Sequence, residues 1–144
     1  MIVDEIMTRD VYTVGMDYTL GQIQKIFEKQ KFHHLLVMED DDLIGIISDR
    51  DVLKEISPHV NTLAEDARAL KSLKKKAHQI MTRQPITVET NTLVENAARI
   101  LLNEHISCLP VISPSGNIEG ILSWKDILGF LIEQMDELPE ASNE

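Results

Sequence analysis

The sequence predicts an α+β fold, α/β-like in its local order, in which two β-α-β-β-α repeats pack about a pseudo-twofold axis into one compact module. Two observations predict it. An Ile-Met-Thr segment occurs at residues 6–8 and again at 80–82, and a Gly-x-x-Ser-x-x-Asp segment occurs at 45–51 and again at 120–126. The offset is 74 residues for the first pair and 75 for the second, so one residue was gained in between. Matched spacing indicates one supersecondary unit used twice, and each copy is too small to bury its own core well.

Each copy begins with a short strand and a helix. In the first copy the strand covers residues 12–14, and the helix opens at Thr19 with Gln22 three residues later. Thr92 and Glu95 have the same spacing in the second copy. Both pairs are typical of capping boxes, and the apolar residues that follow at helical spacing are expected to form the core.

An apolar strand follows each helix, at residues 34–38 and 108–112. A turn-rich segment then leads to a partner strand at 43–47 or 118–122. Turn residues between two apolar runs predict an antiparallel hairpin. A helix between the first two strands predicts that these run parallel, joined by a right-handed crossover.

The chain therefore divides into a first repeat at 1–60, an inter-repeat linker helix at 61–78, a second repeat at 79–135 and an acidic disordered tail at 136–144. Pro58 is expected to end the last helix of the first copy. The linker has helix-forming composition through Lys76.

Composition limits the function classes. With 43% apolar and 26% charged residues among 144, the chain reads as a globular protein, and its apolar runs are far shorter than the roughly 20 residues of a membrane helix. The net charge of −10 argues against nucleic-acid binding. A single cysteine and an N-terminus without a signal-peptide layout predict a cytoplasmic location. The basic run at 71–76 is interpreted as the solvated face of the linker helix.

The final helix is apolar over more than one narrow stripe, so packing on its own copy leaves apolar surface uncovered. We therefore expect a homodimer through the last helices of the repeats, most simply with twofold symmetry. The apolar residues are Ile127, Leu128, Phe130, Leu131, Ile132 and Met135.

Each Gly-x-x-Ser-x-x-Asp segment runs from a strand into the first turn of a helix. The glycine allows a backbone or a flat ligand to approach closely. The serine is expected at the helix N-cap, where free N–H groups can bind an anion, and a basic residue stands beside it. The aspartate, on the same side of the first turn, can accept both hydrogens of a ribose cis-diol. These residues are Ser48, Arg50 and Asp51 in the first copy and Ser123, Lys125 and Asp126 in the second.

Together these groups describe a receptor for the ribose-phosphate part of a nucleotide. The alternative is that the serines are plain N-caps and the acids only favour the helix dipole. Retention of glycine, serine, base and aspartate in both copies favours ligand binding, although duplication alone could preserve them.

From about residue 1 to 135 the chain resembles a tandem pair of CBS (cystathionine β-synthase) domains, a Bateman module. The resemblance rests on the Ile-Met-Thr opening, the Leu-Pro-Val strand at 109–111 and the Gly-x-x-Ser-x-x-Asp stretch. It implies binding of an adenosine nucleotide in clefts between the two copies: AMP, ADP or ATP, with NAD or S-adenosylmethionine as further options. The short chain resembles the stand-alone acetoin-utilisation CBS proteins of bacteria.

By that resemblance, Asp51 and Asp126 would hold ribose, while the neighbouring serines and basic residues would meet phosphate. The base would lie against two strand segments of each copy. The residues implied for the base are Val11, Tyr12, Thr13 and His34 in the first copy and Pro85, Ile86, Thr87 and Cys108 in the second.

The two expected sites differ. Asp49 puts an acid beside the first phosphate position, with Arg50 as partial compensation, whereas the second copy has Trp124 there. Leu36 also replaces the proline that the second copy supplies as Pro110. Our hypothesis is that the second site binds polyphosphates better and the first prefers few phosphates.

Three rival readings remain. His33, His34, His105 and Cys108 could suggest a metal site, but adjacent strand histidines point to opposite faces, so no metal is expected. No activated nucleophile or phosphate loop is recognisable, which argues against an enzyme and a catalytic cofactor. The third rival is a structural dimerisation module with empty clefts. The sequence favours a regulatory ligand sensor without its own chemistry, acting on a target protein in trans.

Overall fold

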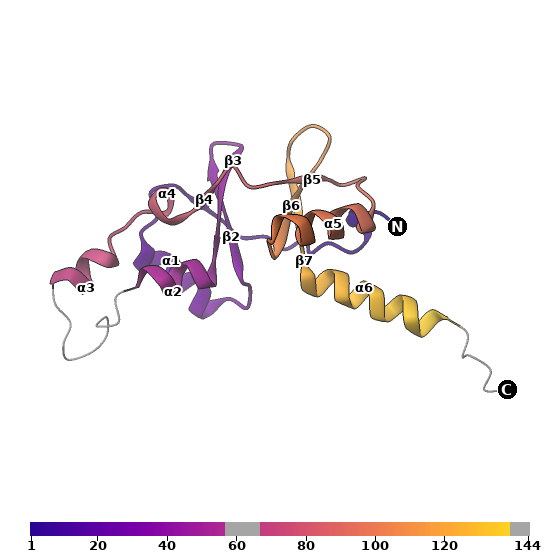
Figure 1. The fold of residues 1–144 in the computed structure, drawn as a ribbon. Coiled ribbons are helices and arrows are strands. Elements are labelled where there is room, and N and C mark those ends of the chain that lie inside the picture. Colours follow the sequence, from indigo (N-terminus) through magenta and orange to yellow (C-terminus); the bar gives the residue numbers. More distant parts are fainter. Residues whose placement is uncertain (57–66, 139–144) are drawn as a thin grey trace. The chain divides into compact units, whose positions relative to one another are not determined.

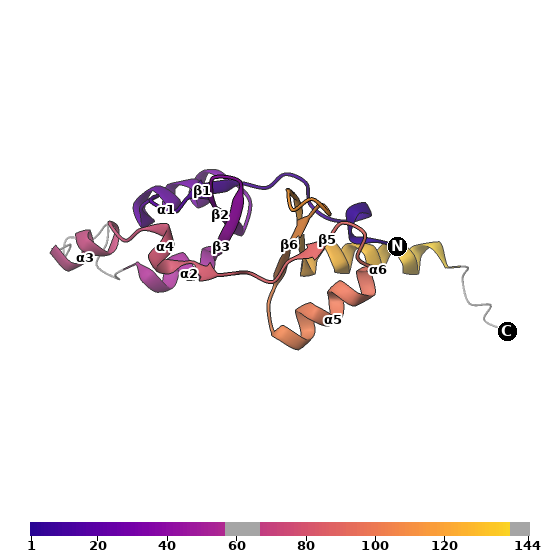
Figure 2. The same ribbon diagram turned by 90° about the horizontal axis from the view of Figure 1, so that it is seen from above.

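The structure is a computed structural model that describes residues 1–56 and 67–138. The chain forms two compact units. The central unit consists of Val11–Pro85, and the terminal unit combines Met1–Asp10 with Ile86–Glu144. Figure 1 and Figure 2 show the elements of both units in two views. The terminal unit is therefore discontinuous in sequence.

The central unit contains a four-stranded sheet in the order β1-β2-β3-β4. β1 runs parallel to β2, whereas the pairs β2–β3 and β3–β4 are antiparallel. The expected parallel pairing and the hairpin are thus confirmed. Its elements are β1 (Thr13–Gly15), α1 (Leu20–Lys29), β2 (His34–Glu39), β3 (Asp42–Ser48), α2 (Asp49–Glu55), α3 (Ala67–Ser72), α4 (Ala77–Ile80) and β4 (Thr82–Arg83).

The terminal unit repeats this pattern in a three-stranded sheet of order β5-β6-β7. β5 is parallel to β6, and β6 is antiparallel to β7. The elements are the 3-10 helix η1 (Val3–Glu5), β5 (Val88–Glu89), α5 (Val94–Glu104), β6 (Cys108–Ile112), β7 (Ile118–Ser123) and α6 (Trp124–Glu137). The prediction of an α+β fold built from two similar repeats is confirmed.

Each unit is completed by a short segment whose sequence belongs to the other copy. We call residues 1–8 and 75–82 the exchange segments. The N–H of Val94 donates to the Met1 carbonyl at 3.0 Å, and the N–H of Leu20 donates to the Lys75 carbonyl at 2.7 Å. The first exchange segment, indigo in Figures 1 and 2, lies against the second copy's strands in both views. In each unit, a carbonyl of the exchange segment therefore accepts the N–H of the residue that begins the first helix.

The exchange segments also continue the sheets. Thr8 and Ile121 exchange backbone hydrogen bonds of 2.9 and 2.8 Å. In the central unit the corresponding pair is Thr82 and Ile46, where β4 joins β3. In both units the Ile-Met-Thr motif therefore pairs with the second strand of the hairpin.

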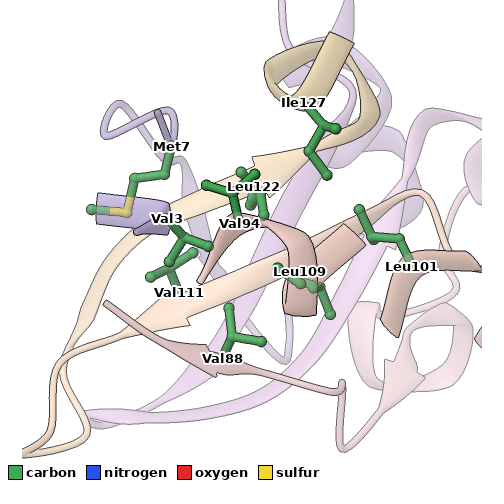
Figure 3. Close-up of a cluster of buried hydrophobic side chains, with 10 residues drawn as sticks. Val3, Met7, Val88, Val94, Leu101, Leu109, Val111, Leu122 and Ile127 are labelled. Atoms are coloured by element: carbon green, nitrogen blue, oxygen red, sulfur yellow. The ribbon is translucent and has the colours of Figure 1, made fainter. Parts of the chain in front are cut away.

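Both hydrophobic cores include residues from the exchange segments. Val3 and Met7 belong to the cluster of the terminal unit, and Ala77 belongs to that of the central unit. Figure 3 shows Val3 and Met7 beside the buried strand residues, among them Val111. Val3 is fully buried, so the N-terminal segment is a structural part of the second copy.

The repeated glycine is explained by close packing of the exchange segment. A Cβ added to Gly120 would lie 2.7 Å from the Thr8 carbonyl oxygen and 2.8 Å from Met7 Sδ. A Cβ on Gly45 would lie 2.8 Å from Met81 Cγ. Such distances are far below van der Waals contact. The close approach expected at this glycine is made by the methionine of the other copy.

One of the two predicted capping boxes is wrong. Thr19 and Gln22 form the expected reciprocal pair, with hydrogen bonds of 2.9 and 3.2 Å. Helix α5, however, begins at Val94 with Leu93 as its N-cap and without a side-chain cap from the described residues. The position equivalent to Thr19 is Leu93, which has no side-chain acceptor. The Met1 carbonyl accepts the N–H of Val94, which has no partner within the helix.

Three further boundaries follow from the structure. The residue gained between the repeats lies in the hairpin turn, which spans 113–117 in the second copy, whereas β2 and β3 leave only 40–41 between them. The helix expected through Lys76 is interrupted after Ser72, because the Lys75 carbonyl accepts the N–H of Leu20. α6 includes the first two residues expected in the tail.

Pro58, the start of the linker and the end of the expected tail lie outside the described residues. Among the residues that are described, no helix combines the length and apolar composition needed to cross a bilayer.

We predict that Gly120→Ala destabilises the protein by about 1–3 kcal/mol, because the new methyl group must displace the Thr8 backbone or the Met7 side chain. Gly129→Ala is the matched control, since a Cβ there meets nothing within 4 Å and alanine favours a helix. Urea denaturation of both variants measures the difference. Equal stability of the two variants would show that the packing at Gly120 is not tight.

Candidate functional site

In the central unit, three chain segments bring the expected first-copy residues to one end of the sheet. Ser48, the last residue of β3, pairs with His34, the first residue of β2. The N–H of Leu36 donates to the Tyr12 carbonyl at 3.0 Å, which places the start of β1 beside them. Val11 immediately precedes Tyr12, and Thr13 pairs with Leu36. The expected base-contacting and phosphate-contacting residues therefore lie on neighbouring strands.

Ser48 and Asp51 form a reciprocal cap at the start of α2. The Asp51 N–H donates to Ser48 Oγ at 3.1 Å, and the Ser48 N–H donates to Asp51 Oδ2 at 2.9 Å. The predicted N-cap position of the serine is confirmed. Within the described residues, Asp51 Oδ1 accepts no hydrogen bond, so one carboxylate oxygen is left for another donor. The side chain of Arg50 is exposed beside this cap.

The terminal unit builds the same arrangement at the start of α6. Cys108, the first residue of β6, pairs with Ser123. The Ser123 N–H donates to Asp126 Oδ2 at 3.0 Å, and the Asp126 N–H lies 3.4 Å from Ser123 Oγ. Lys125 is exposed next to the cap. The second cap is therefore equivalent to the first in position.

The remaining second-copy residues precede β5. Ile86 and Thr87 lie directly before Val88, the first residue of that strand. Pro85 immediately precedes Ile86 and is the last residue of the central unit.

A threonine that the sequence reasoning did not consider contacts the second cap. Thr8 Oγ1 donates to Asp126 Oδ1 at 3.0 Å. The available signal was its place in the repeated Ile-Met-Thr motif. The sequence could not reveal the contact, because the two residues are 118 positions apart.

The two caps have different neighbours. Asp49 Oδ2 lies 2.8 Å from His33 Nδ1, so the acid beside the first cap has a histidine partner. At the corresponding position of the second cap, Trp124 Nε1 donates to the Ile106 carbonyl at 3.2 Å. The sequence suggests His33 as a metal ligand, whereas the structure places it against Asp49.

Burial favours the neutral forms of His34 and Cys108, which are the first residues of β2 and β6. It lowers the pKa of His34 below 6.5, although the nearby carboxylates of Asp49 and Asp51 oppose this shift and His33 adds to it. Burial raises the pKa of Cys108 to about 12. A buried neutral thiol is a poor nucleophile and a poor metal ligand. Within residues 1–56 and 67–138, no three His, Cys, Asp or Glu side chains are grouped as a metal site would need.

A groove of about 210 Å³ lies between α1 and α2 of the central unit. Asp49 is at its edge, but the capping residues Ser48 and Asp51 do not line it. The lining residues are Gln24, Phe27, Glu28, Asp49, Val52, Leu53 and Ile56.

Comparisons with known proteins agree with this architecture. The family model described as "CBS domain" matches residues 3–58 and 77–133. A CBS domain-containing protein of Dictyostelium discoideum is 31% identical, and the alignment covers 99% of each chain.

Solved structures give the same result. The CBS domain pair of protein MJ0100, solved with 5′-methylthioadenosine and S-adenosyl-L-methionine, is 26% identical with a TM-score of 0.75, and the match covers 93% of this chain and 98% of that one. CBSX2, solved with AMP, is 25% identical with a TM-score of 0.76 and the same coverage. A protein of Vibrio cholerae described as an acetoin utilization protein is 21% identical with a TM-score of 0.74, covers 96% and 98%, and supports the fold alone.

We predict that the free energy of unfolding has a component that is lost as the pH falls from about 6.5 toward the lowered pKa of His34. Unfolded His34 binds a proton in this range while folded His34 does not, so acid favours the unfolded state. His34→Gln should remove this component. The measurement is urea denaturation between about pH 7.5 and 5.

The control is His105→Asn, which alters an exposed histidine with a φ of 55° that asparagine also adopts. If the wild-type protein and His34→Gln lose stability in parallel over this range, His34 is not the titrating group.

Proposed function

This chain belongs to the CBS domain family, and we propose that it is a non-catalytic regulatory module that binds adenosine nucleotides or related adenosyl compounds. The observation that carries the proposal is the pair of equivalent Ser–Asp caps, each beside an exposed basic residue and next to the start of two strands. Two related structures at 25% identity or above were solved with adenosine-containing ligands, which supports the ligand class.

Each proposed contact follows from the chemistry of the site. Asp51 and Asp126 are carboxylates that already have their orientation fixed by a cap, so they are suited to accept hydrogen bonds from ribose hydroxyls. The hydroxyl groups of Ser48 and Ser123 would meet phosphate, and that of Ser123 would first turn its hydrogen away from Asp126 Oδ2. Arg50 and Lys125, both exposed, add a positive charge at the same end.

The adenine would lie against the strand starts. The neutral forms of His34 and Cys108 suit this role, because both can contact a flat, uncharged base without a buried charge. The other residues proposed for the base are Val11, Tyr12, Thr13, Pro85, Ile86 and Thr87.

The neighbours of the caps support a difference between the sites. Asp49 adds a negative charge beside the first cap. Its His33 partner is 75% exposed, so a positive charge on His33 would offset the Asp49 charge only weakly, because solvent screens it. Trp124 carries no charge at the second. We propose that the second site accepts polyphosphates such as ATP or ADP better, and that the first prefers a ligand with few phosphates, such as AMP.

Signalling would require that the ligand favours one conformation of the module over another. A target protein acting in trans would detect that conformation, in the cytoplasm where the single buried thiol remains reduced.

The exposed face of α6 supports a homodimer. Leu128, Leu131, Ile132 and Met135 are between 49% and 69% exposed, although all four are apolar. On α2, the last helix of the first repeat, Leu53 is 73% exposed. Figure 1 shows that the last turns of α6 extend away from the end of β7. The same surface favours the second candidate function, a structural dimerisation module that binds no ligand.

We predict that calorimetry will detect binding of AMP and ATP to the full chain. Asp126→Ala should weaken ATP binding by about tenfold or more, and Asp51→Ala should have its larger effect on AMP, because each change removes a charged acceptor for ribose. Asp136→Ala, an exposed acid near the end of α6, is the control. Equal losses for both ligands would reject the distinction between the sites. Absence of binding by every adenosyl compound would reject the ligand-binding function.

We also predict that sedimentation at micromolar concentration shows a dimer. Leu131→Glu should shift it toward monomer, because a charge in the centre of the apolar face must lose its hydration on association. Leu102→Glu is the matched control, as Leu102 is a leucine of α5 with 57% exposure. A wild-type protein that sediments only as monomer would contradict the proposal.

A further inference from the structure

One side-chain hydrogen bond connects the Ile-Met-Thr motif to the carboxylate proposed to bind ribose in the terminal unit. Thr8 Oγ1 donates to Asp126 Oδ1 at 3.0 Å. The backbone of Thr8 is itself fixed, because it exchanges hydrogen bonds of 2.9 and 2.8 Å with Ile121 of β7. The Thr8 hydroxyl is therefore held at a defined place beside the cap.

The other oxygen of Asp126 belongs to the cap. Oδ2 accepts the Ser123 N–H at 3.0 Å and lies 3.2 Å from Ser123 Oγ. With Thr8 on Oδ1, both oxygens of the carboxylate are held, so the rotation of its plane is restricted before any ligand arrives. An ionised carboxylate offers about four acceptor positions, of which these three donors leave about one, on Oδ1.

The central unit has a different arrangement. Thr82 occupies the place of Thr8 and pairs with Ile46 as Thr8 pairs with Ile121. Among the described residues, no hydrogen bond joins Thr82 to Asp51, whose Oδ2 accepts the Ser48 N–H. Within residues 1–56 and 67–138, the carboxylate of Asp126 is held through both oxygens, whereas that of Asp51 is held through Oδ2.

We propose that Thr8 is a positioning residue for ligand binding in the terminal unit. Its hydroxyl holds Asp126 Oδ1 so that the remaining acceptor position on this oxygen takes a hydrogen bond from a ribose hydroxyl of an adenosine ligand. An acceptor that is already oriented loses no side-chain freedom on binding, which increases affinity. This inference rests on the proposed function and adds to it a residue from the opposite sequence copy.

The test compares ATP with 2′-deoxy-ATP by calorimetry on the full chain carrying Asp51→Ala, so that the terminal site dominates the signal. In this parent, ATP should bind about tenfold more tightly than 2′-deoxy-ATP, because the latter lacks one hydroxyl of the diol. Thr8→Val should weaken ATP binding by about tenfold and reduce the ratio of the two affinities toward one. Thr8→Ser, which keeps the hydroxyl, should restore the ratio.

Thr82→Val is the matched control and should leave both affinities unchanged. If Thr8→Val lowers the folded fraction in a thermal melt, Thr8→Ala provides the same loss of hydroxyl with less crowding. The inference is overturned if Thr8→Val keeps the parent's preference for ATP over 2′-deoxy-ATP, whether or not the overall affinity falls, because a merely structural threonine would not change the discrimination. A parent that binds neither ligand overturns this inference, and a wild-type chain that binds no adenosine nucleotide overturns the proposed function as well.

Discussion

The rest of this structure depends on the reciprocal exchange of two short segments between the sequence copies. Each segment supplies a carbonyl to the first N–H of the opposite copy's first helix, here Met1 to Val94 and Lys75 to Leu20. Each also adds apolar side chains to the opposite core. A helix start needs partners for its free N–H groups, and a small β-α-β-β-α unit has little apolar surface to bury. The exchange satisfies both needs, which explains why the duplicated sequence folds as two interdependent units.

The same exchange shapes the candidate site. The glycine of each Gly-x-x-Ser-x-x-Asp segment is required because the methionine of the opposite Ile-Met-Thr motif packs directly on it. The threonine that follows this methionine then lies next to the strand end from which the capping serine and aspartate project. In the terminal unit this brings Thr8 to Asp126. Two motifs that are far apart in sequence thus act as one structural element, and a change in one is expected to affect the other.

Duplication has left two similar caps in unequal surroundings. An exposed carboxylate–imidazole contact between Asp49 and His33 lies at the first cap, whereas the Trp124 indole and the Thr8 hydroxyl lie at the second. Solvent screens the interaction between two exposed side chains. The effect of Asp49 and His33 on a bound anion therefore depends on their combined charge and not on the contact between them. This difference is the basis of the proposed preferences for phosphate number, since both caps have extended backbone at the serine and the same capping pattern.

The sequence alone determined the repeat, the order of strands and helices, the parallel and hairpin pairings, and the N-cap roles of Ser48 and Ser123, because these depend on local periodicity and on residues a few positions apart. The apparent cap at Thr92 failed because a carbonyl from the distant N-terminus satisfies the helix start instead. Only the tertiary structure decided which copy each Ile-Met-Thr motif packs against, and that His33 faces Asp49 and Thr8 faces Asp126. The physical reason is that the exchange segments and the strand register bring these residues together. Local sequence patterns do not indicate such contacts.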